Sequence, residues 1–234
     1  MTPEPEPREY PFWTYEDLGL FIGSLIPIFF LAWVVVSIFP MPSPAVRALI
    51  YQSLVYVSLL GVMYLLVAWR YREPFWRSLC WVPFRLPFLC AAAGPALAFA
   101  ISYLGGILRA PPVPSPIEAL ISDRRSVVVM MLFLTVVGPI FEELTFRGFL
   151  FPLLARTVGP WIGILLAALP FAVIHGPQYR WSWQQITLVG LAGVFFGVVR
   201  YKAKSTAAAT LVHMGYNATF FIGFMVQKSL NIDM

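Results

Sequence analysis

Long stretches without a charged residue run through most of the chain and are separated by short polar links. Each is near or above the ~20 apolar residues that a helix needs to cross ~30 Å of hydrocarbon. We therefore predict an all-α fold, a polytopic transmembrane helix bundle of about seven spans, with eight as the alternative. The charge-free runs are residues 18–46, 48–69, 86–108, 126–141, 157–179, 181–199 and 205–227.

Composition supports this interpretation. The chain has 234 residues, of which 59% are hydrophobic and only 12% charged, and its mean hydropathy is +0.78. These values exclude an ordinary water-soluble domain. The net charge of +5 comes from Lys and Arg in the loops, where such residues orient spans in a membrane, so we expect the lipid bilayer and no nucleic acid as a partner. The oligomeric state is not predicted.

We divide the chain into two parts. Residues 1–15 should form a flexible N-terminal tail, because their alternating prolines resist helix formation and nothing among them could build a core. Residues 16–234 should form a single membrane domain. Within it, the segment from Ser126 to Arg156 is too long for one crossing, so we expect bends at Pro139 and Pro152 and an interfacial or re-entrant piece.

Few titratable groups occur in the second half of the chain, and they lie within apolar surroundings. Between residues 124 and 232 the only carboxylates are Glu142 and Glu143, and the only two histidines, His175 and His213, also fall in this half. A charged side chain near mid-bilayer costs roughly 2.5–3.5 kcal/mol, so such groups face a protein interior or water and are functional by default. We expect them to line an intramembrane, water-filled cavity.

Helical spacing relates these groups to one another. Glu143 and Arg147 are four residues apart with the acid first, which is the better-oriented ion pair on a helix. Glu142 is turned ~100° from its neighbour and is left free to hold a water molecule. His213 and Asn217 are also four apart and therefore point the same way.

The fifth predicted span supplies a third pair. Phe171 and His175 are four residues apart, and Gly176 and Pro177 then end the helix, which would place His175 at the mouth of a cavity. Each group has a structural alternative: an ion pair that only stabilises the fold, histidines bonded to neighbouring helices, and an Asn217 that holds helices together. Because three separate helices each contribute polar groups, the combination favours one shared site.

These residues form three motifs: Glu-Glu-x-x-x-Arg at 142–147, Phe-x-x-x-His at 171–175 and His-x-x-x-Asn at 213–217. In this order they resemble the CPBP or ABI family, the type II CAAX prenyl endopeptidases and bacteriocin-processing intramembrane proteases. The resemblance covers residues 126–227, the catalytic motif region. It implies an all-α bundle with a cavity open to the cytoplasm, and endopeptidase cleavage in the C-terminal region of a membrane-associated peptide or protein. The substrate would be CAAX-like, bacteriocin-like or a sorting tail.

Peptide hydrolysis needs an activated water, stabilisation of the oxyanion and a proton for the leaving amine. We expect Glu142 to act as general base and then acid, His175 to help hold the water, and His213 with Asn217 to donate hydrogen bonds to the oxyanion. This agrees with the glutamate mechanism that the resemblance implies. The expected catalytic residues are Glu142, Glu143, His175, His213 and Asn217, with Arg147 and Phe171 in support.

Zinc is the alternative to this cofactor-free mechanism. Glu142, His175 and His213 could supply three ligands and leave a fourth position for water. The motif His-Glu-x-x-His is absent, and Asn217 suits an oxyanion better than zinc, so we expect no cofactor. No serine or cysteine is paired with a histidine by spacing, so a covalent nucleophile is not indicated.

Two other functions remain as alternatives. One is a non-catalytic membrane protein, immunity-like or chaperone-like, that sequesters a peptide. The other is a proton-coupled transporter, which the lack of visible inverted repeats makes less favoured. For the location we expect a multi-pass integral protein of a prokaryotic plasma membrane, from the compact size and short loops.

Overall fold

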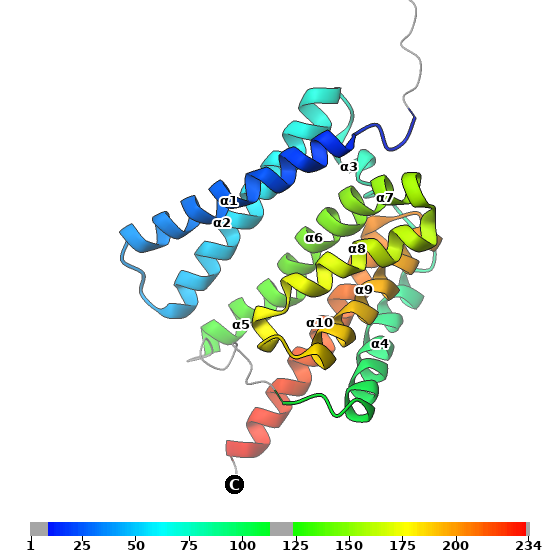
Figure 1. Ribbon diagram of the computed structural model, residues 1–234. Coiled ribbons are helices and arrows are strands. Elements are labelled where there is room, and N and C mark those ends of the chain that lie inside the picture. Colours follow the sequence, from blue (N-terminus) through cyan, green and yellow to red (C-terminus); the bar gives the residue numbers. More distant parts are fainter. Residues whose placement is uncertain (1–8, 113–123, 233–234) are drawn as a thin grey trace, which may run out of the picture.

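The computed structural model describes residues 9–112 and 124–232, and every regular element in this part of the chain is helical (Figure 1). The prediction of an all-α fold is therefore confirmed. The elements are α1 (Tyr15–Ile38), α2 (Pro44–Tyr64), η1 (Leu65–Trp69), α3 (Phe75–Ser78), α4 (Pro87–Ile107), α5 (Arg124–Leu132), η3 (Phe133–Val137), α6 (Gly138–Glu143), η4 (Leu144–Leu150), α7 (Phe151–Val158), α8 (Pro160–Ile174), η5 (Pro177–Tyr179), α9 (Trp183–Ala203) and α10 (Thr206–Ile232).

Six helices in the described part of the chain are long and apolar enough to cross a membrane. The remaining predicted span forms α8, which is apolar but has only 15 residues. Its short length follows from its ends: Gly159 adopts a φ of +81° just before the helix, and Gly176 with Pro177 follows it. Together with α8, these helices make the expected seven apolar segments of a multi-pass integral membrane protein.

The helices α1 and α2 form a hairpin on one side of the molecule, and α4 lies on the opposite side of the bundle (Figure 1). An apolar cluster around Met63, Leu79 and Phe149 joins the hairpin to the long central helix. A second cluster, around Phe171 and Phe196, joins the central helix to α8, α9 and α10. The second cluster lies directly behind the histidines described below.

The predicted N-terminal tail is in part a packed segment. Residues 1–8 lie outside the described part of the chain. Trp13, by contrast, is fully buried: its indole N–H donates to the Phe149 carbonyl at 3.0 Å, and the two rings stack with centroids 5.6 Å apart. The guanidinium of Arg156 donates to the carbonyl of Trp13 at 3.4 Å. An indole that is buried with its N–H satisfied stabilises the fold, which the proline pattern does not reveal.

The acidic pair lies within one helical run from Arg125 to Val158. This run continues through Pro139 and Pro152, where the sequence predicts bends. Two π-helical turns flank the pair, η3 before it and η4 after it. Such turns are rare and frequently occur at functional sites.

Helix α4 crosses α10 at backbone contact distance. A Cβ atom added at Gly94 would lie 2.5 Å from the Val212 carbonyl oxygen and 2.7 Å from the Tyr216 amide nitrogen. Only glycine permits this approach, as is common where helices pack in membranes. The crossing fixes α10, which carries the second histidine, against the bundle.

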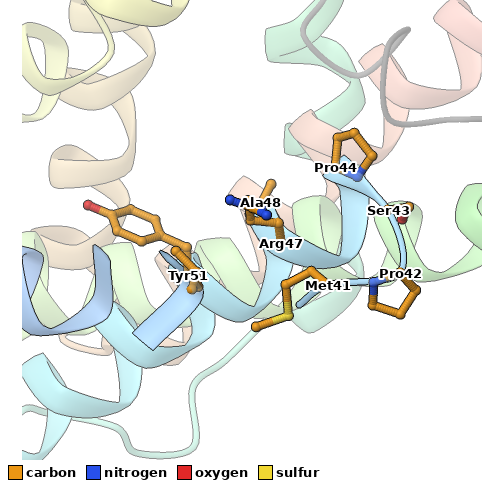
Figure 2. A pocket seen from close by; sticks show the side chains of 8 residues that line it. Met41, Pro42, Ser43, Pro44, Arg47, Ala48 and Tyr51 are labelled. Carbon is orange, nitrogen blue, oxygen red and sulfur yellow. The ribbon is translucent and has the colours of Figure 1, made fainter. Parts of the chain in front are cut away.

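Two surface cavities lie away from the acidic pair. One, of about 600 Å³, is at the α1–α2 turn (Figure 2), and the other, of about 410 Å³, lies between α4 and α10. Neither is the cavity that the sequence predicts around the glutamates and histidines, which stays a prediction. The first is lined by Val36, Met41, Pro42, Ser43, Pro44, Arg47, Ala48 and Tyr51, and the second by Ala98, Phe99, Ser102, Thr219, Phe220, Gly223, Phe224 and Gln227.

Candidate active site

The predicted ion pair is present and fully enclosed. Arg147 Nη1 donates to Glu143 Oε1 at 2.9 Å, and the two side chains are 1% and 0% exposed. The other terminal nitrogen of Arg147 donates to the Gly193 carbonyl at 2.7 Å, and the guanidinium lies 4.4 Å from the centre of the Phe171 ring. A buried charge is tolerated only with such partners, so Arg147 fixes both the charge and the position of Glu143.

His213 is oriented by the same carboxylate. Its Nδ1 lies 2.9 Å from Glu143 Oε1, and its ring stacks on Phe196 with centroids 4.3 Å apart. Because an ionised carboxylate only accepts, this bond assigns a proton to Nδ1. The remaining nitrogen, Nε2, faces Glu142, whose Oε2 is 3.8 Å away.

The surroundings of Glu142 differ from those of Glu143, as the helical spacing predicts. It has no bond to Arg147, and its side chain is 18% exposed where that of Glu143 is 0%. Its Oε1 accepts a hydrogen bond of 3.2 Å from the Tyr56 hydroxyl on α2. The 3.8 Å between Oε2 and His213 Nε2 exceeds the length of a direct hydrogen bond.

His175 lies on the same side of the bundle as His213. Its Nδ1 is 2.6 Å from the Phe171 carbonyl, and its ring centroid is 4.8 Å from that of Phe171. The centroid of the Phe171 ring also lies 5.9 Å from the centroid of the His213 ring. Phe171 therefore contacts both imidazole rings, and in each ring Nδ1 lies within hydrogen-bond distance of a partner.

Tyr179, in the turn after His175, is partly buried. This burial and the negative charge of Glu142 raise the pKa of its hydroxyl.

Asn217 joins two helices through a hydrogen bond to a backbone carbonyl. Its amide Nδ2 donates to the Leu134 carbonyl at 2.9 Å. That carbonyl lacks a helical partner, since the Gly138 N–H bonds to Phe133 and Pro139 has no N–H to offer. Asn217 therefore completes the π-helical turn η3, and one N–H of its amide is left for a second acceptor.

The alternative zinc site is not assembled in the described residues. No group of three His, Cys, Asp or Glu side chains comes together there as metal ligands. The ligand set considered from the sequence, Glu142, His175 and His213, is not among such groups in the described residues, and the question of a metal stays a prediction.

Three contacts of the site have no signal in the sequence. Tyr56, Gly193 and Phe196 touch Glu142, Arg147 and His213 respectively, yet each is an ordinary residue of an apolar helix. Spacing within one helix cannot reveal a partner on another. The buried Glu143 Oε2 has no hydrogen-bond partner in the described part of the chain, so it can accept one more bond.

Comparison with known proteins adds one match. The family model described as type II CAAX prenyl endopeptidase Rce1-like matches residues 124–219, a segment that contains all three motifs. The match confirms the family resemblance predicted from the motifs. No curated protein and no solved structure gives a significant match to the chain.

Proposed function

We propose that the protein is an intramembrane endopeptidase, because the model of the Rce1-like family of type II CAAX prenyl endopeptidases matches residues 124–219. The family supports proteolysis in general, and six apolar helices support a membrane-associated substrate. The cleaved bond would lie in the C-terminal region of a peptide or protein held at the bilayer. CAAX-like, bacteriocin-like and sorting-tail substrates all fit this description, and a prokaryotic plasma membrane is the location we expect.

One observation carries the proposal: two adjacent carboxylates flank a single imidazole in different environments. Glu143 is buried and bound to Arg147 and to His213 Nδ1, whereas Glu142 is partly exposed and faces His213 Nε2. Two like groups whose surroundings differ in this way commonly divide the roles of orienting and reacting. Glu142 is therefore the reacting group.

In the proposed reaction, Glu142 takes a proton from water as the oxygen attacks the peptide carbonyl carbon. The carbonyl π electrons move onto its oxygen, and His213 Nε2–H and the second Asn217 N–H donate to that oxyanion, each donor lowering the barrier by about 3 kcal/mol. As the oxyanion collapses, the C–N bond breaks and Glu142 returns its proton to the leaving amine. In this role His213 carries protons on both nitrogens, and His175 Nε2 helps to hold the water.

The first test is the variant Glu142→Gln. It preserves shape but cannot accept a proton, so cleavage of a prenylated CAAX peptide by the protein reconstituted in liposomes should fall at least 100-fold. Glu73→Gln, a change in the loop after α2, is the matched control and should leave activity unchanged. Mass spectrometry of membrane-protein C-termini in cells with each variant would identify native substrates.

The outcomes separate the candidate functions. A non-catalytic immunity-like or chaperone-like protein should tolerate Glu142→Gln in a peptide-binding assay, and the wild-type chain should then cleave none of the three substrate classes. A transporter should move protons or solute into proteoliposomes and lose this uptake in the variant. Incubation with a chelator should leave cleavage intact under the proposed mechanism, and restoration by zinc after a loss would contradict it.

A further inference from the structure

Helix α2 lies outside the segment that the family model matches, yet it contacts the reacting carboxylate. The Tyr56 hydroxyl lies 3.2 Å from Glu142 Oε1. Its ring is nearly parallel to two phenylalanine rings of the central helix: the centroid of Phe141 is 4.8 Å away at 9°, and that of Phe133 is 6.0 Å away at 11°. These ring contacts hold the Tyr56 hydroxyl beside the Glu142 carboxylate.

The direction of the hydrogen bond follows from chemistry. An ionised carboxylate can only accept, so Tyr56 is the donor to Glu142. Helix α2 thus supplies the donor to one oxygen of Glu142.

Glu142 needs such a partner more than its neighbour does. The terminal torsion of a glutamate is broad, so a carboxylate without a fixed contact samples many orientations. Glu143 is held by Arg147 and His213, but the only hydrogen bond of Glu142 within the described residues comes from Tyr56. Without it, nothing would keep Oε2 directed at His213.

We propose that Tyr56 is a positioning residue of the active site: its hydroxyl holds Oε1 of Glu142 so that Oε2 stays directed at His213 Nε2. The inference rests on the proposed endopeptidase function. It assigns to α2 a part in the reaction, although the sequence of the first three spans carries no motif.

Tyr56→Phe tests this role, because it retains the ring stack and removes only the hydroxyl. We expect kcat to fall about tenfold, the effect of losing one hydrogen bond to a charged group, while KM stays within about twofold. Tyr64→Phe is the control on the same helix, where the side chain is 53% exposed, and it should leave both constants unchanged. An unchanged kcat, or a raised KM with kcat intact, would overturn the proposal.

An infrared measurement tests the contact without relying on proteolysis. The difference spectrum between wild type and Tyr56→Phe should contain a shift in a carboxylate stretch, and the same comparison in a Glu142→Gln background should lack it. If this signal is present but the wild-type chain cleaves nothing, the proposed function fails while the contact stands. If cleavage occurs but the signal is absent, the positioning role fails.

Discussion

At the scale of single residues, the site depends on how its charges are neutralised. Glu143 and Arg147 are both buried and share one hydrogen bond, and His213 uses the same carboxylate oxygen. A buried pair of this kind contributes little net stability over apolar residues, but it is costly to break. In this structure the pair fixes one imidazole, that of His213.

Arg147→Met should therefore destabilise the protein more than its loss of packing suggests. It leaves the Glu143 carboxylate buried without a cation, at a cost of about 3–5 kcal/mol. Thermal unfolding in detergent, followed by circular dichroism, measures this loss.

The double variant Glu143→Gln with Arg147→Met should recover much of the stability, since the unpaired charge is gone. Arg85→Met, a change of an exposed arginine, is the control and should unfold like the wild type. Equal unfolding temperatures for Arg147→Met and Arg85→Met would contradict the stated role of the ion pair.

At the scale of elements, close helix contact and local irregularity position the residues of the candidate site. The π-helical turns η3 and η4 bracket the acidic pair, and Asn217 of α10 bonds the carbonyl that η3 leaves unpaired. The same helix α10 meets α4 at Gly94 with no room for a side chain. The position of His213 therefore depends on the packing of both faces of α10.

Gly94→Ala tests the crossing. The new methyl group would meet backbone atoms at 2.5 and 2.7 Å, so α4 must move away from α10, and we expect a loss of about 1–3 kcal/mol in the free energy of unfolding. Gly106→Ala on the same helix meets nothing within 4 Å and should be neutral or stabilising by up to about 1 kcal/mol. Chemical unfolding in detergent compares the two, and similar values would show that the crossing is not tight.

At the scale of the whole molecule, segments far apart in the chain meet on the central helix. Trp13, before the first span, stacks on Phe149 and belongs to the apolar cluster around Met63, Leu79 and Phe149. Tyr56 of α2 donates a hydrogen bond to Glu142 on the same central helix. The α1–α2 hairpin therefore contacts the candidate site in addition to supplying two apolar spans.

Trp13→Ala should cost about 3–5 kcal/mol, because it removes a fully buried ring and its hydrogen bond. It should also make the segment before α1 sensitive to added protease, which gel analysis of cleavage products would detect. Trp33→Ala is the control within α1, where the side chain is 57% exposed on the outside of the bundle. If both variants unfold alike and resist protease alike, residues 10–14 are not anchored as described.

The sequence by itself determined the fold class, the seven apolar segments and the pairs related by helical spacing. Glu143 with Arg147, and Phe171 with His175, are four residues apart, and backbone geometry alone brings such pairs into contact. Apolar length likewise follows from composition, because the thickness of the hydrocarbon core sets the number of residues in a span. All of these features are local in the chain, so the order of the amino acids is enough to predict them.

Only the tertiary structure decided which helices meet and through which atoms. It places His213 Nδ1 on Glu143, Tyr56 on Glu142, Asn217 on a backbone carbonyl and Trp13 in the core. Each of these contacts joins residues between 70 and 136 positions apart in the chain. A repeat of 3.6 residues carries no information across such distances, since side-chain packing between helices selects the partner.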